Sequence, residues 1–127
     1  MPYLQLDVVE RYPIDVKRAL AQHFGRLYAE IMQTTPERVS VGFRELSVGS
    51  LWRCGHGEPE PAAVLMCDIR RGRPAEHRAR LAQALVDACV ETLGLRSDRL
   101  AVEFTQHNGD EMYRDGQLSA DWAPDEV

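Results

Sequence analysis

The sequence lacks the features that mark membrane, secreted and nucleic-acid-binding proteins. No apolar run approaches the roughly 18 residues that a membrane-spanning helix needs. The opening segment, MPYLQLDVVERYP, has no basic region followed by a long apolar stretch, so we do not expect a secretion signal. The formal net charge of -5 disfavours a sequence-independent grip on nucleic acid or on an anionic membrane. We therefore expect a cytoplasmic protein with neither nucleic acid nor membrane as a partner.

Cysteine and metal-ligand patterns are sparse as well. The three cysteines are an odd number without C-x-x-C spacing, and Cys67 and Cys89 fall in apolar patterns that suit small buried side chains in a reducing compartment. Cys54 and His56 offer two ligands, whereas a structural zinc takes about four. No Walker, Rossmann or G-x-S-x-G pattern occurs. The sequence therefore predicts neither a metal nor a cofactor.

What the sequence does contain is an internal repeat. An offset of 61 residues aligns the two halves in one unbroken register, from Leu4 on Leu65 to Phe43 on Phe104. Further identical positions are Asp7 with Asp68, Leu20-Ala21-Gln22 with Leu81-Ala82-Gln83, Glu30 with Glu91, Arg38 with Arg99 and Val41 with Val102. Such a repeat fixes the architecture before any local assignment. We expect a single domain, 1–127, with repeats at about 2–45 and 63–106, a connecting loop at 46–62 and a C-terminal tail at 107–127.

Each half has the pattern of a strand, a helix and a second strand. Four segments are short and apolar or alternating, as strands are: 2–9, 39–43, 63–69 and 100–104. Apolar residues recur at helical spacing from Ile14 to Met32 and again from Leu81 to Leu93, with Gly94 ending the second helix. A strand–helix–strand unit of this kind is a right-handed crossover between parallel strands. The predicted fold class is thus α/β, an α+β two-layer tandem βαβ whose four-stranded sheet carries both helices on one face.

One face of that sheet has no helix to cover it. Tyr3, Val9, Val64 and Met66 are placed to point to this side, and a sheet with apolar residues on an uncovered face usually packs on a partner subunit. We expect a homo-oligomer on these grounds. We also expect Trp52 to pin the connecting loop to the core, and the polar, acidic tail to be weakly structured.

The layout alone is shared with ferredoxin-like domains of many functions, but particular segments resemble one superfamily. A chain that begins Met-Pro-(apolar strand), continues with a helix and a P-x-R-V-x-V strand, and repeats the plan resembles the tautomerase superfamily (4-oxalocrotonate tautomerase-like). Within it the chain is most similar to the cis-3-chloroacrylic acid dehalogenase branch, and next to malonate semialdehyde decarboxylase. The segments that carry the resemblance are VGFRELSVGSLWRCG (41–55), IRRGRPAEHRARLAQALVDA (69–88) and VEFTQHNGDEMYRDG (102–116). It implies a tautomerase/MIF-like fold, a homotrimer and no cofactor.

Pro2 is the first candidate catalytic residue. Removal of Met1, for which a following proline is a usual substrate, would free a secondary amine. An α-amine titrates near ~7.7–8.0, and burial or nearby cations lower that pKa. Such an amine suits proton transfer at a carbon beside a carbonyl. The plain alternative is that Pro2 only begins an edge strand.

Three arginines come at the end of the third strand-like segment. A guanidinium binds a carboxylate bidentately, so Arg70, Arg71 and Arg73 predict an anion site that also lowers the pKa of Pro2. The alternative is a solvated turn in which Arg70 pairs with Asp68. The resemblance implies an R-x-x-R pair, Arg70 and Arg73, for the dehalogenase branch. For the decarboxylase it implies an R-x-R pair, Arg71 and Arg73.

The sequence departs from the dehalogenase pattern at three places. Tyr28, or Leu27 with a one-residue shift, stands where the relatives have a histidine. Glu103 stands where they have a tyrosine, and Arg114 where they have the glutamate that activates water. Loss of that glutamate argues against dehalogenation. Tyr28 or Glu103 is left to handle a second proton, and Arg71 and Arg114 to help bind an anionic substrate.

These observations lead to three hypotheses. The first is a tautomerase that uses Pro2 as general base for keto–enol proton transfer on a small 2-oxo or enol carboxylate held by Arg70 and Arg73. The second keeps Pro2 protonated as a general acid in a decarboxylase, hydratase or dehalogenase-like reaction on a small three-carbon acid. The third, from a different class, is a non-catalytic ferredoxin-like small-molecule-binding module.

Overall fold

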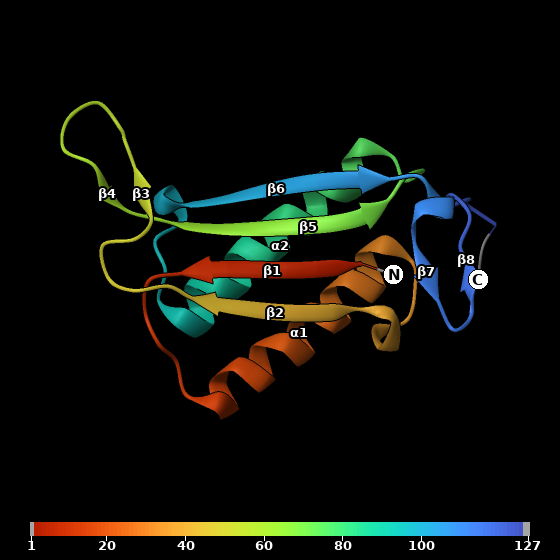
Figure 1. Cartoon of the computed structure of the whole chain (residues 1–127), viewed down its shortest axis with the longest axis horizontal. Coiled ribbons are helices and arrows are strands. Elements are labelled where there is room, and N and C mark those ends of the chain that lie inside the picture. The colour runs from red at the N-terminus through yellow and green to blue at the C-terminus, as the bar shows by residue number, and fades with distance from the viewer. Residues whose placement is uncertain (1, 126–127) are drawn as a thin grey trace.

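The computed structural model describes residues 2–125. Its main elements are a four-stranded sheet and two long helices (Figure 1). The elements follow in the order β1 (Tyr3–Val8), α1 (Ile14–Met32), η1 (Pro36–Arg38), β2 (Ser40–Glu45), β3 (Trp52–Arg53), β4 (Glu60–Pro61), β5 (Ala63–Arg70), α2 (Ala75–Leu93), η2 (Ser97–Arg99), β6 (Leu100–His107), η3 (Gly109–Glu111), β7 (Tyr113–Arg114) and β8 (Gln117–Leu118), where η marks a 3₁₀ helix.

The main sheet has the strand order β2-β1-β5-β6 (Figure 1). β1 and β2 run parallel, with Tyr3 opposite Ser40, and β5 and β6 run parallel, with Ala63 opposite Leu100. The two units meet at β1 and β5, which are antiparallel. Each long helix lies in the crossover between two parallel strands, and both helices cover the same face of the sheet. The predicted duplicated βαβ is therefore confirmed.

Both long helices are bounded by residues whose backbone preferences explain the boundary. α1 follows Pro13 and α2 follows Pro74, and proline is tolerated at a helix start because its missing N–H is not needed there. After α1, Gln33 adopts the left-handed conformation at φ 58°, and Gly94 does the same after α2 at φ 69°. The predicted helix at 14–32 and the predicted stop at Gly94 are confirmed.

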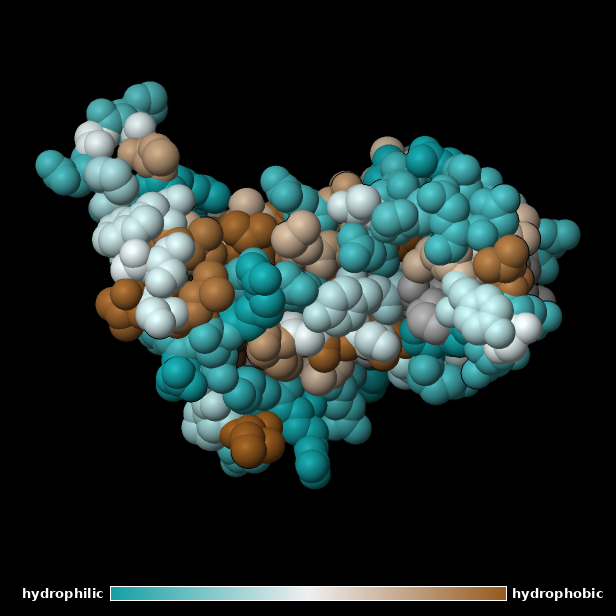
Figure 2. Space-filling model, in the orientation of Figure 1, coloured by the Kyte–Doolittle hydropathy of each residue, from teal (hydrophilic) through white to brown (hydrophobic). Residues whose placement is uncertain are grey.

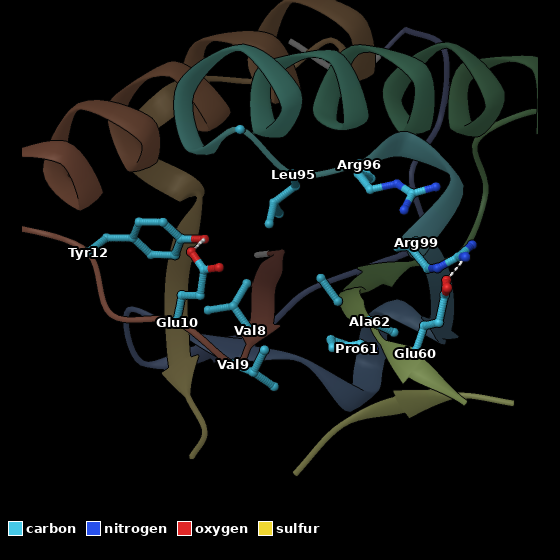
Figure 3. Close-up of a pocket in the computed structure, with 12 residues that line it drawn as sticks. Val8, Val9, Glu10, Tyr12, Glu60, Pro61, Ala62, Leu95, Arg96 and Arg99 are labelled. Atoms are coloured by element: carbon cyan, nitrogen blue, oxygen red, sulfur yellow. Dashed lines mark hydrogen bonds and ion pairs between the residues drawn. The ribbon is translucent and has the colours of Figure 1, made fainter. Parts of the chain in front are cut away.

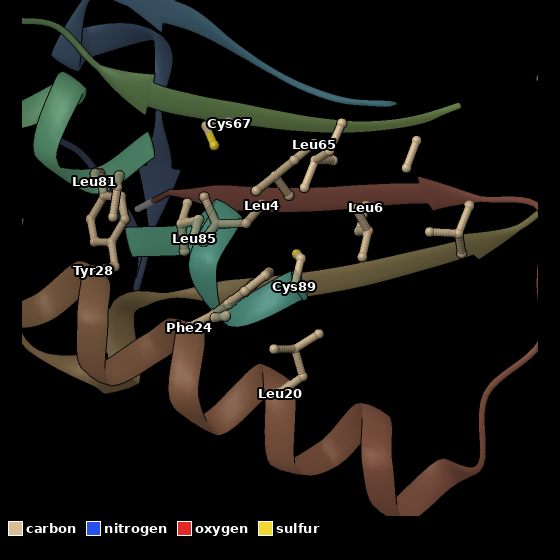
Figure 4. Close-up of a cluster of buried hydrophobic side chains, with 14 of the residues drawn as sticks. Leu4, Leu6, Leu20, Phe24, Tyr28, Leu65, Cys67, Leu81, Leu85 and Cys89 are labelled. Atoms are coloured by element: carbon tan, nitrogen blue, oxygen red, sulfur yellow. The ribbon is translucent and has the colours of Figure 1, made fainter. Parts of the chain in front are cut away.

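The covered face of the sheet and the inner faces of both helices enclose one apolar core (Figure 4). Its fully buried members include Leu4 and Leu6 of β1, Leu20, Phe24 and Tyr28 of α1, Leu65 and Cys67 of β5, and Leu81, Leu85 and Cys89 of α2. Alternate strand positions and helix positions three to four apart supply them. Val41, Phe43, Val102 and Phe104 pack against this core from the outer strands, as predicted.

Core burial leads to a prediction about the three thiols. Cys67 and Cys89 are fully buried, and burial raises the pKa of each to about 12, whereas Cys54 is exposed. Only a thiolate reacts as a nucleophile. We expect 5,5′-dithiobis(2-nitrobenzoate) to label one thiol in the native chain and all three in urea, and Cys54→Ser to abolish the native labelling. Labelling of a second thiol at the same rate would contradict the described core.

The opposite face of the sheet is open (Figure 2). Val64 and Met66 lie on it at alternate positions of β5 and are half-buried. Asp7 accepts hydrogen bonds there from Arg44 Nε and Nη2, at 2.9 and 3.0 Å, and from Gln5 Nε2 at 3.0 Å. Figure 2 shows apolar side chains gathered over the left-hand ends of β1, β5 and β6, beside polar ones. The face is thus open as predicted, and the homo-oligomer that would cover it stays a prediction.

The connecting segment 46–62 differs from the prediction. It contains a two-stranded antiparallel hairpin, β3 and β4, which projects from the end of the sheet (Figure 1). Trp52 is 50% exposed, and its indole Nε1 donates a hydrogen bond to the Gly49 carbonyl at 2.9 Å. The prediction that Trp52 pins this segment to the core is wrong, because the indole lies on the projecting hairpin and meets its hydrogen-bonding need locally.

The tail is more ordered than predicted. Its described part forms η3, β7 and β8 at the end of the sheet where β1 begins (Figure 1), and its last two residues lie outside the described part. Trp122 is 6% exposed, and its backbone N–H donates to the Arg71 carbonyl at 2.9 Å. The prediction of a weakly structured tail is wrong because a buried aromatic and a backbone hydrogen bond anchor this otherwise polar segment.

Candidate functional site

The N-terminal end of β1 is where most of the predicted site residues meet. Pro2 is buried, and its carbonyl accepts a hydrogen bond from Ser40 N at 3.1 Å. Because β1 lies between β2 and β5, Pro2 is flanked by the start of β2 on one side and by the last residues of β5, beyond the Tyr3–Asp68 pair, on the other. Met1, whose removal the prediction requires, lies outside the described residues.

Arg70 occupies the last position of β5 and is 8% exposed. Its Nη1 donates a hydrogen bond to the Ala120 carbonyl at 2.8 Å. Burial lowers the pKa of Arg70 most, and the charges of Arg38 and Arg114 lower it further, while Tyr28 acts in the opposite direction. Arg38, Arg70 and Arg114 therefore place positive charge at the Pro2 end of the sheet. Guanidinium groups placed in this way suit the binding of a carboxylate.

Arg73 lies in the turn before α2 and is 5% exposed. Its Nε donates to the Met32 carbonyl at 2.7 Å, at the end of α1. Its Cζ lies 5.8 Å from the centroid of the Tyr28 ring and 5.3 Å from that of Trp122, both within cation–π range. Burial lowers the pKa of Arg73, and so does Arg70, while Tyr28 opposes them. Arg73 thus ties the start of α2 to the end of α1 in addition to its predicted role with substrate.

Tyr28 is 1% exposed and extends from α1 toward the two arginines. Burial raises the pKa of Tyr28 to about 12, even though Arg73 and Arg70 favour the phenolate. The phenol consequently keeps its proton at neutral pH and is a hydrogen-bond donor. Its hydroxyl has no hydrogen-bond partner among the described residues. Leu27, the alternative at this position, packs against the core instead.

The Arg71 side chain points away from the buried Arg70 and Arg73, toward the end of β6 and the tail. Its side chain is exposed, and it donates to Asn108 Oδ1 at 3.1 Å and to the Gln106 carbonyl at 3.4 Å. It therefore links the end of β6 to the tail. Arg70 and Arg73 are both buried, and the charge of Arg70 lowers the pKa of Arg73, whereas Arg71 is exposed and turned to the tail; which pair binds a substrate stays a prediction.

Arg114 and Glu103 are separated by the fold. Arg114 lies on β7, close enough for its charge to act on Arg70, with its Nε 3.6 Å from Asp115 Oδ2. Glu103 lies in the middle of β6, opposite Met66, on the open face of the sheet. It is exposed and away from the Pro2 end of its own chain. Its own subunit therefore does not bring Glu103 to Pro2.

Two residues at the site were not predicted as functional. Arg38 closes η1, two residues before Ser40, and acts on Arg70. The sequence contained a signal for it, since Arg38 matches Arg99 in the repeat, but that match indicated only architecture. Trp122 packs on Arg73, and its signal was the presence of one large aromatic residue near the end of a polar tail.

A cavity of about 410 Å³ lies at the opposite end of the sheet (Figure 3). Val8, Ala62 and Leu95 line it, and the Glu60–Arg99 ion pair lies at its edge. None of the predicted site residues lines this cavity. Among residues 2–125, no group of three or more His, Cys, Asp or Glu side chains is placed to hold a metal ion. Within the same part of the chain, no helix is long and apolar enough to cross a membrane.

Comparison with known proteins identifies the fold. No family model matches the chain, and no curated protein matches its sequence. Among solved structures, Pt0534 inactivated by 2-oxo-3-pentynoate is 23% identical, with a TM-score of 0.81 over 93% of this chain and 95% of that one. N1, a member of the cis-3-chloroacrylic acid dehalogenase family, is 22% identical, with a TM-score of 0.83 over 94% and 84%. A fused 4-OT described as a symmetric trimer is 20% identical, with a TM-score of 0.81 over 93% and 95%.

Likeness at this level of identity concerns the fold. The chain has the tautomerase-superfamily fold, of the tautomerase/MIF-like type that the sequence predicted. The likeness covers 93–94% of the chain.

Proposed function

We propose that this chain, which has the tautomerase-superfamily fold, is an enzyme that catalyses keto–enol proton transfer on a small 2-oxo or enol carboxylate. Pro2, with Met1 removed, is the general base. The observation that carries the proposal is the gathering of Arg70, Arg73 and Tyr28 at the end of the sheet where Pro2 is buried. A basic nitrogen, an anion site and a protonated phenol are the groups that this reaction needs.

In the ketonisation direction, the neutral Pro2 amine accepts the proton of the enol hydroxyl. The C–O bond becomes a carbonyl, the C=C electrons move to the terminal carbon, and that carbon takes a proton from the Pro2 ammonium. The substrate carboxylate is held by Arg70 and Arg73, and Arg114 adds recognition of negative charge. Tyr28 donates a hydrogen bond to the oxygen that carries the developing charge. Arg71, which links β6 to the tail, has no part in this scheme.

Two of the compared structures support parts of this proposal. The compound that inactivated Pt0534, 2-oxo-3-pentynoate, is a 2-oxo acid, which is the substrate class proposed here. The fused 4-OT is a symmetric trimer, and the open face of this sheet would be covered in a homotrimer. In such an assembly Glu103, which faces outward from its own subunit, would lie in an interface. A role for Glu103 with the second proton therefore depends on a neighbouring subunit.

A panel of enol-pyruvates and dienols tests the proposed reaction. Ketonisation is followed by ultraviolet absorbance, because the conjugated enol and the ketone absorb differently. We expect turnover of at least one member of the panel, and loss of that turnover when Pro2 is replaced. If no member is ketonised faster with the native chain than with the Pro2 variant, the proposal fails.

The pH dependence of kcat/KM follows from the protonation states of Pro2 and Tyr28. A buried amine near guanidinium groups should have a pKa below the ~7.7–8.0 of a free α-amine, so kcat/KM should rise with pH through that pKa and then level off. Because burial holds the pKa of Tyr28 near 12, the donor stays protonated and gives no descending limb below about pH 11. Tyr28→Phe should lower kcat by about 10²–10³-fold, the scale of a lost donor to a developing oxyanion, and leave the ascending limb in place. A descending limb near neutral pH, lost in Tyr28→Phe, would contradict this assignment.

A second candidate is decarboxylation of a small 3-oxo acid, with Pro2 protonated. It is favoured by one observation: Arg114, at the position where the dehalogenase relatives have the glutamate that activates water, lies close enough for its charge to act on Arg70. Loss of carbon dioxide needs no activated water, whereas hydration and dehalogenation do. Here the rate should fall as pH rises, which is opposite to the tautomerase profile.

A further inference from the structure

The tail crosses the end of the sheet as a strap that reaches both arginines of the proposed anion site. The strap comprises residues 119–122. Four hydrogen bonds anchor it. Two backbone N–H groups of the strap donate, Ser119 N to the Met112 carbonyl at 2.9 Å and Trp122 N to the Arg71 carbonyl at 2.9 Å. Two strap oxygens accept, the Ala120 carbonyl from Arg70 Nη1 at 2.8 Å and Asp121 Oδ1 from Gly109 N at 2.6 Å. Consecutive residues are thus each fixed by a hydrogen bond.

Two glycines allow the strap to lie this close. Gly72 has φ +130°, a conformation that side-chain-bearing residues rarely adopt, and a Cβ there would overlap the Trp122 carbonyl. A Cβ on Gly109 would overlap the backbone at Ala120 and Asp121. The seat of the strap is therefore formed by backbone on both sides, and its position leaves little freedom.

The strap delivers the Trp122 ring to the Arg73 guanidinium. The Cζ of Arg73 lies 5.3 Å from the indole centroid and 5.8 Å from the Tyr28 centroid, so two rings contact one cation. His77 meets the indole edge-on, with ring centroids 5.8 Å apart and planes at 75°. The indole Nε1 is buried and has no hydrogen-bond partner among the described residues. Because the Trp122 ring is held by these contacts, it restricts the orientation of the Arg73 guanidinium.

We infer that Trp122 is a positioning residue for the anion site: the strap fixes Arg73 through the indole ring and Arg70 through the Ala120 carbonyl. A guanidinium fork binds a carboxylate well only in the right orientation, and fixing it beforehand reduces the entropy lost on binding. The identity of the anion as a substrate carboxylate rests on the proposed function. The restraint on Arg73 and Arg70 does not.

The direct test uses arginine Nε–H signals in ¹H–¹⁵N NMR spectra of the whole chain. We compare Trp122→Leu with Trp52→Leu, which removes the exposed tryptophan at the other end of the molecule. In Trp122→Leu the Arg73 Nε–H signal should shift and its hydrogen exchange should accelerate about tenfold or more. Neither should change in Trp52→Leu. A native Arg73 signal and exchange rate in folded Trp122→Leu would overturn the inference.

The consequence for binding is measured with pyruvate, a small 2-oxo acid, by calorimetry. An arginine that must be ordered on binding costs about 0.5–1.5 kcal/mol, which corresponds to a rise in Kd of about 2–12-fold. KM should rise in parallel while kcat stays within about 3-fold, and Trp122→Phe, which keeps a ring over Arg73, should restore most of the affinity. An unchanged Kd in Trp122→Leu, with only the unfolding temperature lowered, would mean that the strap is structural alone.

If Trp122→Leu does not fold, the test uses the variant Trp52→Phe instead. Trp122 is the only tryptophan of that variant, so its fluorescence emission can be followed alone. Saturating pyruvate should change that emission, because the anion binds next to the cation that the indole touches. Unchanged emission at occupancy confirmed by calorimetry would overturn the inference. If the native chain binds no pyruvate and shows no Pro2-dependent turnover, the proposed function fails, and the Arg73 signal still decides the role of Trp122.

Discussion

Replacing Pro2 with alanine should lower kcat/KM for ketonisation by about 10²–10⁴-fold, the range typical of a lost general base. Once Met1 is removed, the alanine variant still has an α-amine, but that amine is primary and rotates freely. The pyrrolidine ring fixes the backbone angle at Pro2 and so fixes the direction of the nitrogen lone pair. The measurement is the initial rate, with the unfolding temperature recorded alongside.

A chain in which an added N-terminal residue is retained gives a sharper control. The Pro2 nitrogen is then an amide with no useful basicity, while every side chain of the site is unchanged. We expect this chain to be folded and inactive. If the native, alanine and blocked chains ketonise equally fast, Pro2 is not catalytic, and the non-catalytic small-molecule-binding module becomes the better reading.

Arg70→Ala should lower kcat/KM by about 10–100-fold, while Arg71→Ala should change it by less than about 3-fold. A hydrogen bond to a charged group contributes about 1.5–3 kcal/mol, which accounts for the first figure. Arg70 is buried at the Pro2 end of the sheet, whereas Arg71 is exposed and bonds to the end of β6 and to Asn108. The two residues are adjacent in the chain and identical in chemistry, so each is the matched control for the other.

Arg70→Lys separates charge from geometry. Lysine keeps the positive charge but lacks the planar fork that binds both carboxylate oxygens, so we expect only partial recovery relative to alanine. Unfolding temperatures are needed for all three variants because Arg70 also bonds to the Ala120 carbonyl. Loss of activity in Arg71→Ala with activity kept in Arg70→Ala would favour the R-x-R spacing and the decarboxylase-like reading.

The fold could be predicted because its determinants are repeated and local. The offset that aligns Leu4 with Leu65 also aligns the helices and the second strands, so each half supports the assignment of the other. The apolar spacing from Ile14 to Met32 predicts α1 at the bounds that the structure has. Residues that alternate or recur at helical spacing report directly on the face that they bury.

The tail and the connecting segment could not be predicted, because neither repeats and neither has a period. Trp52 and Trp122 are both single tryptophans in polar, irregular sequence, yet one is exposed and the other buried. What separates them is backbone far away in the chain: Gly72 lets the Trp122 backbone approach closely, and Trp52 has no such seat. Sequence alone does not report which distant turn will meet which aromatic residue.

The positions of the candidate site residues could be predicted only where they follow from the strands. Pro2 directly precedes β1 and Arg70 ends β5, so the sheet order brings them to the same end of the sheet, and Arg73 follows in the turn before α2. The choice between Arg70 and Arg71 depended on the direction of each side chain at a strand end, where the alternation of the strand stops. Glu103 was predicted from a position on β6, but the register places it opposite Met66, away from Pro2.

The central claim, that Pro2 is a neutral base at physiological pH, is tested most directly by NMR titration of the chain labelled with ¹⁵N-proline. We predict one titrating secondary amine with a pKa below the ~7.7–8.0 of an unperturbed α-amine, because burial and the nearby guanidinium groups disfavour the ammonium form. A pKa at or above ~9 would contradict the claim and make Pro2 an acid, as the decarboxylase reading requires. No titrating amine would mean that the Pro2 nitrogen is an amide and cannot act as a base.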